Sequence, residues 1–233
     1  PNHDVQRKAV SPIVAPGNLA GFADLIRERT ARVLDGLPRG ETFDWVEKVS
    51  IELTTLMLAT LFDFPLEDRH LLPFWSDVAT DVPELNPESP RTREQRQEEL
   101  QKMAAYFARL WNERVNAPPR GDLVSMLAHG EATRNMGPME FLGNLVLLIV
   151  GGNDTTRNSM TGGLLALHRN PAEWGKLRAN PNLIENMVSE IVPWQTPLAH
   201  MRRTALADIE LAGQKIRKGD KVVMWYFSGN RDD

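Results

Sequence analysis

The stretch from residue 137 to residue 170, GPMEFLGNLVLLIVGGNDTTRNSMTGGLLALHRN, constrains the fold more than any other part of this chain. Pro138 suits the first position of a helix and Glu140 suits its first turn, so a helix is predicted to begin here. Residues 141–150 are apolar with two exceptions, which predicts a helix that is buried on every side. If the helix continues through the whole stretch, it is about 50 Å long.

Glycines and polar residues interrupt the middle of this predicted helix. Gly151 and Gly152 each cost about 1 kcal/mol relative to alanine, which indicates that a large group approaches the backbone closely. The hydroxyl of Thr155 can bond back to the carbonyl of Gly151 and open the helix locally. Asp154 then places a carboxylate beside a loosened groove, and this arrangement suits proton delivery.

The sequence Gly-Gly-x-Asp-Thr-Thr in a long central helix resembles the oxygen-binding helix of the cytochrome P450 haem-thiolate monooxygenases. The resemblance implies that Thr155 holds dioxygen, that Asp154 relays protons, and that haem b lies against Gly151 and Gly152. The residues that it assigns to the substrate pocket are Leu147, Val150, Leu198, Ala199 and Met201. The alternative for the Asp-Thr-Thr sequence alone is an ordinary polar patch on a helix.

Three further residues match positions that contact the haem propionates in this family. His3 and Arg7 are four residues apart, hence on one helix face, and two such donors suit a pair of carboxylates. Arg203 stands at the start of a predicted strand and matches the family's propionate-binding arginine, with Arg202 as second choice. The alternatives are a solvated helix face for the first two residues and a basic strand edge for the third.

The family also carries Glu-x-x-Arg on a later helix, as a buried pair that supports the haem-side core. Glu190 matches this structural glutamate, but Pro193 stands where the arginine is expected. Proline inside a helix removes a hydrogen bond and clashes with the carbonyl four residues back, at a cost of about 3 kcal/mol. We interpret Pro193 as a sequence error or the mark of a damaged gene copy; otherwise we expect this helix to unwind early.

The rest of the chain predicts a mainly α fold with a small antiparallel β region near the C-terminus. Asp44 is a candidate cap for the second helix. Helices are predicted at residues 18–37, 43–63, 66–81, 93–116 and 122–129, with two more that start at Pro171 and Pro181, and short strands at residues 202–227. The resemblance implies that residues 1–233 are a fragment of a single cytochrome P450-like domain, from its third helix to the strand before the proximal loop.

Composition narrows the partners and the location of the protein. The net charge of −4 gives no case for nucleic-acid binding. We find no signal peptide and no apolar run long enough to span a membrane, and we expect a cytoplasmic protein. The chain contains no cysteine, so it holds no metal ligand of the thiolate type. The proximal cysteine of the family is therefore absent, and we expect this chain alone to be inactive.

The resemblance implies a haem-dependent monooxygenase that inserts one oxygen atom of O2 into an unactivated C–H bond. The wording LAHMRRTALADIELAG is most similar to the bacterial soluble alkane terminal hydroxylases, which act on medium-chain alkanes or fatty acids. Electrons would come from NAD(P)H through a ferredoxin reductase and a ferredoxin, which the basic residues Arg7 and Lys8 would help to dock. The alternative is a haem-free helical binding module or a decayed, non-catalytic relative. The two observations that favour it are the missing cysteine and Pro193.

Overall fold

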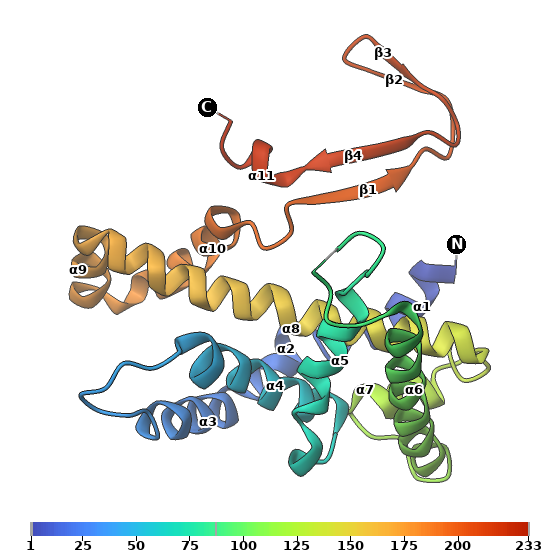
Figure 1. The fold of residues 1–233 in the computed structure, drawn as a ribbon, viewed down its shortest axis with the longest axis horizontal. Helices are drawn as coiled ribbons and strands as arrows, with labels where there is room; N and C mark the ends of the chain where they lie inside the picture. Colours follow the sequence, from blue (N-terminus) through green and yellow to red (C-terminus); the bar gives the residue numbers. More distant parts are fainter. Residues whose placement is uncertain (1, 87, 233) are drawn as a thin grey trace. The chain divides into compact units, whose positions relative to one another are not determined.

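The computed structural model describes residues 2–86 and 88–232; of Asn2 and His3 it describes the backbone only. It confirms a mainly helical fold with a small antiparallel β region (Figure 1). The chain divides into two compact units, Pro1–Arg157 and Asn158–Asp233. The boundary between them falls within α8 (Pro138–Arg169), the long helix that the sequence predicts. With 32 residues, α8 is about 48 Å long.

The first unit consists of helices, several of which begin where the sequence predicts. The elements are α1 (Asn2–Val10), α2 (Pro16–Ala20), α3 (Ala23–Asp35), a π-helical stretch (Val46–Ile51), α4 (Glu52–Phe62), a 3-10 turn (Leu66–Asp68), α5 (Leu71–Thr80), α6 (Arg93–Val115), α7 (Leu123–His129) and the first part of α8. Asp44 caps its helix as predicted, because its Oδ1 accepts a hydrogen bond from the backbone N–H of Glu47 at 3.0 Å.

Two of the predicted helices are each divided into shorter pieces. The stretch predicted at 18–37 breaks at Gly21, which ends α2 before α3 begins. The stretch predicted at 66–81 forms a 3-10 turn and then restarts as α5, which places Pro73 within the first turn of the new helix. A proline is tolerated there because the first turn needs no N–H donors, whereas it would break a helix that ran through it.

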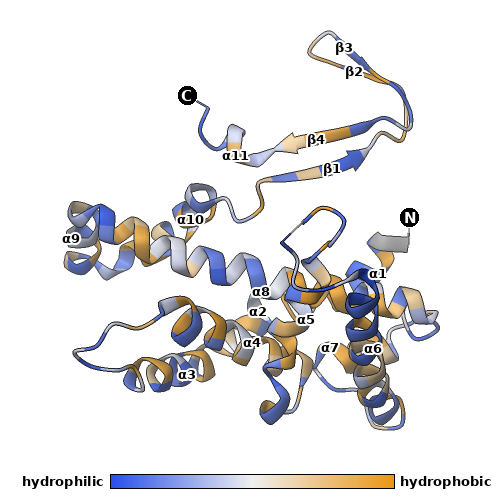
Figure 2. Cartoon of the chain, viewed as in Figure 1, coloured by the Kyte–Doolittle hydropathy of each residue, from blue (hydrophilic) through white to orange (hydrophobic). Residues whose placement is uncertain are grey.

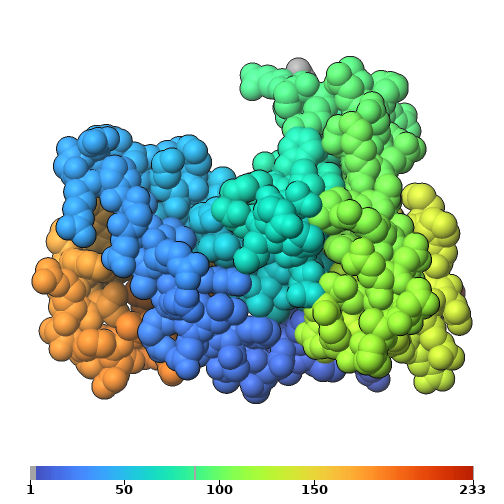
Figure 3. All heavy atoms as spheres, turned by 90° about the horizontal axis from the view of Figure 1, so that it is seen from below, coloured from blue at the N-terminus to red at the C-terminus, as the bar shows by residue number. Residues whose placement is uncertain are grey.

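Aromatic side chains from three segments fill the core of the first unit. The Phe62 and Phe107 ring centroids lie 5.4 Å apart, and those of Phe64 and Tyr106 lie 4.8 Å apart. Figure 2 shows α4 and α5 largely in the hydrophobic colour, whereas α6 carries both colours. In the space-filling view, α3 adjoins α4 in blue, while α5 in teal and α7 in lighter green adjoin α6 (Figure 3).

Helix α8 is buried along one face and not on every side, which corrects the prediction from its apolar run. Leu145, Ile149 and Asn153 recur every fourth residue and are 0–1% exposed. Leu147, by contrast, is 58% exposed, and Gly151 is exposed too. The apolar run does not reveal which face is buried: Leu145 and Ile149 belong to the core of the first unit, whereas Leu147 does not.

The second unit combines the end of α8 with short helices and two hairpins. Its elements are α9 (Pro171–Ala179), a 3-10 turn (Pro181–Leu183), α10 (Ile184–Gln195), β1 (His200–Thr204), β2 (Ile209–Leu211), β3 (Gln214–Ile216), β4 (Lys221–Trp225) and α11 (Tyr226–Gly229). β1 pairs with β4 and β2 with β3, both antiparallel, as the alternating sequence predicts. Gly213, at φ +77°, makes the tight turn between β2 and β3.

Helix α10 passes through Pro193 and ends at Gln195, so the expected early unwinding does not occur. The reason lies at its end, where the C-terminal carbonyls find donors. Asn230 Nδ2 donates to the carbonyl of Pro193 at 3.2 Å, and Arg231 Nη2 donates to that of Trp194 at 3.1 Å. Pro193 stands in the last turn, so these two hydrogen bonds offset part of the stability that is lost with the missing N–H of the proline.

In the part of the chain that the structure describes, no single helix has both the length and the apolar composition needed to cross a membrane. One sharply bent pair, Asp4–Ala20 with Ala23–Asp35, meets the criteria of length and composition together, with a bend of 77°.

Candidate functional site

Thr155 and Asp154 lie at the middle of α8, where the helix meets the core of the first unit. Thr155 Oγ1 donates a hydrogen bond to the carbonyl of Gly151 at 3.0 Å, which is the back-bonding that the sequence predicts. The helix nevertheless stays α-helical through this turn, so the predicted local opening is not present. The side-chain bond is added at a carbonyl with two lone pairs and does not displace the backbone bond.

The two central glycines face different surroundings. A Cβ atom on Gly152 would lie 2.7 Å from Cδ2 of Leu58, so α4 is the group that approaches the backbone there. A Cβ atom on Gly151 would meet nothing within 4 Å. Gly152 therefore has a packing reason within the fold, and Gly151 lies on the open side of α8.

Asp154 belongs to a small charged network. Arg157 Nη2 lies 2.8 Å from Asp154 Oδ1 and 3.1 Å from Oδ1 of Asp77 on α5, so one guanidinium nitrogen bridges two carboxylates. Burial raises the pKa of Asp154 and Asp77 raises it further, whereas the positive charge of Arg157 opposes both. The spacing of Asp154 and Arg157 was readable from the sequence, but a contact 80 residues away on α5 was not.

Asn153 is a site residue that the sequence analysis missed. It is fully buried, and its Oδ1 lies 3.1 Å from the hydroxyl of Thr54 on α4. Its Nδ2 donates to Asp154 Oδ1 at 3.3 Å. The signal that could have found it is its place in the four-residue repeat of Leu145 and Ile149, where a polar residue must find partners inside the core.

A hollow of about 440 Å3 on the open side of α8 brings two of the predicted residues together, Arg7 of α1 and Leu147 of α8. Gly143 leaves room in its wall, because a Cβ atom there would meet nothing within 4 Å. Val150 is half-buried on the same helix. The side chain of His3 falls outside the described residues, and only its place in α1 is known.

The other predicted residues lie in the second unit. Met201 and Arg203 alternate along β1 and therefore share one face of it, while Arg202 lies on the other face. Arg203 is exposed and donates through Nη1 to the carbonyl of Arg202 at 3.1 Å. Leu198 and Ala199 precede the strand and are exposed.

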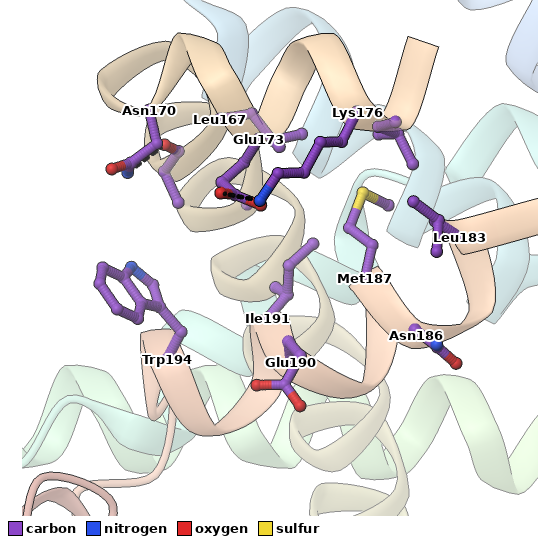
Figure 4. A pocket seen from close by; sticks show the side chains of 13 residues that line it. Leu167, Asn170, Glu173, Lys176, Leu183, Asn186, Met187, Glu190, Ile191 and Trp194 are labelled. Carbon is purple, nitrogen blue, oxygen red and sulfur yellow. Dashed lines mark hydrogen bonds and ion pairs between the residues drawn. The ribbon is translucent and has the colours of Figure 1, made fainter. Parts of the chain in front are cut away.

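A pocket of about 380 Å3 lies within the second unit, between the end of α8, α9 and α10 (Figure 4). Its wall is mostly apolar, with Trp194 at one side and the Lys176–Glu173 ion pair of 2.7 Å at another. Glu190 lines it and is exposed. A Cβ atom on Gly163 would lie 2.6 Å from Cδ1 of Ile191, so a glycine lets α10 lie close to α8 behind the pocket.

Comparison with known proteins places the whole chain in one group. No family model matches it. It is 36% identical over 234 residues to linalool 8-monooxygenase of Pseudomonas putida and 33% identical over 236 residues to steroid C26-monooxygenase of Mycolicibacterium smegmatis. Both alignments cover all of this chain but 57% and 53% of the relatives, so the chain spans about half their length.

Solved structures agree along the whole chain. The cytochrome P450-153 from Novosphingobium aromaticivorans superimposes with a TM-score of 0.88 at 51% identity, covering 100% of this chain and 56% of that one. CYP153D17 from Sphingomonas sp. PAMC 26605 gives a TM-score of 0.89 at 51% identity, with 100% and 57% covered. The chain belongs to the cytochrome P450 family.

Proposed function

We propose that this chain is part of a haem-dependent monooxygenase that inserts one oxygen atom of O2 into an unactivated C–H bond. The observation that carries the proposal is the pairing of a hydroxyl and a carboxyl on the open side of a helix that is buried along another face. Thr155 bonds back to Gly151 at 3.0 Å, and its neighbour Asp154 is a partly buried acid whose pKa is raised. A carboxyl with a raised pKa holds its proton closer to neutral pH, as a proton donor must.

The residues on the open side of α8 fit a flat, largely apolar cofactor with carboxylate edges. Gly143 and Gly151 keep the helix surface low, and Leu147 presents apolar surface between them. Arg7 lines the hollow that also contains Gly143 and Leu147, and its guanidinium supplies a cation for a carboxylate. The thiolate ligand of the iron is not among residues 1–233, which contain no cysteine.

Each assigned residue has a distinct task in this proposal. His3, Arg7 and Arg203 would hold the propionates of haem, and Gly151 would lie against its ring, whereas Gly152 packs against Leu58 of α4. Haem, once bound and given two electrons, would supply the activation of dioxygen. Asp154 would take a proton from the solvent side and pass it to the hydroxyl of Thr155, which would hold dioxygen in place. Glu190 would serve the structure alone.

The substrate class that we favour is a medium-chain alkane or fatty acid that is hydroxylated at its end. The sequence LAHMRRTALADIELAG supports this choice, because it resembles that of the bacterial soluble alkane terminal hydroxylases. The relatives named for linalool and steroid are only 33–36% identical to this chain, whereas two P450 structures of the 153 group are 51% identical. Leu147, Val150, Leu198, Ala199 and Met201 would contribute apolar surface for such a chain. An apolar pocket orients a hydrocarbon by shape, because hydrocarbons offer no polar groups.

Electrons would come from NAD(P)H through a ferredoxin reductase and a ferredoxin in the cytoplasm. The last turn of α1 carries two exposed cations, Arg7 and Lys8, which suit an acidic electron carrier. Reversing the charge with Lys8→Glu should slow electron transfer at low salt, and an unchanged rate would remove this assignment.

Haem retention tests the proposal against the alternative of a haem-free binding module or a decayed relative. The enzyme that contains this chain should take up haem, and Arg7→Gln should lower its affinity for haem. Lys8→Gln is the matched control, since this neighbouring cation does not line the hollow with Leu147. An enzyme that takes up no haem would favour the alternative.

A further inference from the structure

Asp154 is held by two neighbours, and both act on the same oxygen atom. Arg157 Nη2 lies 2.8 Å from Asp154 Oδ1, and Asn153 Nδ2 donates to that same Oδ1 at 3.3 Å. No described residue donates a hydrogen bond to Oδ2. The two contacts therefore fix the rotation of the carboxyl group and leave Oδ2 as the atom that can exchange a proton.

The two neighbours of Asp154 are themselves anchored to different helices. Asn153 is fully buried, and its side-chain oxygen lies 3.1 Å from the hydroxyl of Thr54 on α4. Arg157 reaches Asp77 on α5 at 3.1 Å. The carboxyl group is thereby connected to α4 through Asn153 and to α5 through Arg157.

Charge around Asp154 comes from two groups with opposite effects. Arg157 of its own helix is 23% exposed, and Asp77 of α5 is 51% exposed. From α4 only the neutral Thr54 takes part, through Asn153. Asp154 itself is 27% exposed, so solvent screens these interactions only in part.

We propose that Arg157 is the positioning residue of the proton-delivery step: it holds Asp154 Oδ1 and ties it to Asp77, so that Oδ2 is the oxygen that transfers the proton. This inference rests on the proposed function, in which Asp154 relays protons to Thr155. Arg157 and Asp77 affect Asp154 in opposite ways. Removing Arg157 takes away a positive charge beside the acid, whereas removing the charge of Asp77 leaves Arg157 to Asp154 alone.

Two substitutions in the haem-loaded enzyme should shift the acid in opposite directions. Arg157→Gln should raise the pKa of Asp154, because the charge that opposes its protonation is lost. Asp77→Asn should lower that pKa, because a nearby negative charge is removed. The measurement is the pH titration of the Asp154 carboxyl stretch by infrared difference spectroscopy, with Asp154→Asn identifying the band. This readout does not depend on turnover.

Activity gives the second readout. Arg157→Gln should lower the fraction of electrons recovered as product and displace the pH profile of that fraction upward, and Arg157→Lys should restore it in part. The matched control is Arg27→Gln on α3, since Arg27 and Asp24 have the same three-residue spacing and the same 2.8 Å separation. That control should change neither the carboxyl titration nor the recovery of electrons.

Shifts of the carboxyl titration in the same direction for Arg157→Gln and Asp77→Asn, or no shift in either, would overturn the inference. A general loss of structure would also move both variants alike, which is why the opposite signs matter. Failure of the proposed function looks different. In that case the opposite shifts of the acid remain, but the wild-type enzyme gives no oxygenated product.

Discussion

At the scale of single residues, Thr155 bonds within its own helix, whereas Asp154 is connected through Arg157 to another helix. A back-bonding threonine is local, because its acceptor lies four residues away on the same helix. Asp77 of α5 reaches Arg157 of α8 only in the folded chain, and no spacing rule reaches across 80 residues. Buried Asn153 was not predicted, because it follows the apolar run and the run does not show which face of α8 is buried.

Replacing Thr155 should separate oxygen consumption from product formation. In Thr155→Ala we expect product per NAD(P)H to fall by about tenfold or more, since a positioned proton donor contributes about 10²–10⁴-fold. Thr155→Ser keeps the hydroxyl and should retain most of the coupling. The measurement compares NAD(P)H consumed with product formed, and unchanged coupling in the alanine variant would remove the role of Thr155.

The two central glycines should respond differently to an added methyl group. Gly151→Ala places Cβ in open space and should stabilise α8 by up to about 1 kcal/mol. Gly152→Ala pushes against Leu58, which is 2% exposed, and overpacking costs about 1–3 kcal/mol. Urea unfolding of both variants measures the difference. Equal stabilities would mean that α4 does not constrain α8 at Gly152.

At the scale of secondary-structure elements, helix positions were predictable where periodicity and caps agree. Asp122 accepts from the N–H of Ser125 at 2.8 Å and starts α7, one residue after the predicted start. The breaks were not predicted, because the restart of α5 depends on where Pro73 is tolerated. The contact of α10 with α8 through Gly163 was missed too, since a glycine in a helix does not reveal what lies against it.

Helix α10 offers a direct test of how its end is stabilised. Pro193→Ala should raise the free energy of unfolding by about 1–3 kcal/mol, because alanine restores the missing N–H and removes the ring clash. Asn230→Ala should lower it by about 1 kcal/mol, because the carbonyl of Pro193 and the hydroxyl of Thr196 lose a donor. Thermal unfolding of the two variants measures both effects. A proline-to-alanine change without gain in stability would show that the last turn is already frayed.

At the scale of the whole molecule, the mainly α fold with its terminal hairpins and the membership of the cytochrome P450 family were both readable from the sequence. The Gly-Gly-x-Asp-Thr-Thr sequence on α8 and the strand that carries Arg203 identified the family because they combine special residues in a fixed order. Exposed surface was not readable: Leu147 belongs to an apolar run and is nevertheless 58% exposed. The extent of the domain and the cytoplasmic location stay predictions.

The central claim is that the enzyme containing this chain inserts an atom of dioxygen into a C–H bond, and labelled oxygen tests it most directly. The haem-loaded enzyme, with a ferredoxin, its reductase and NAD(P)H, should convert a medium-chain alkane in 18O2 to a terminal alcohol with one labelled oxygen atom. Mass spectrometry of the product reads out both the label and its position. Product that carries oxygen from water, or haem-loaded enzyme that forms no alcohol from alkanes, fatty acids, terpenes or steroids, would contradict the account.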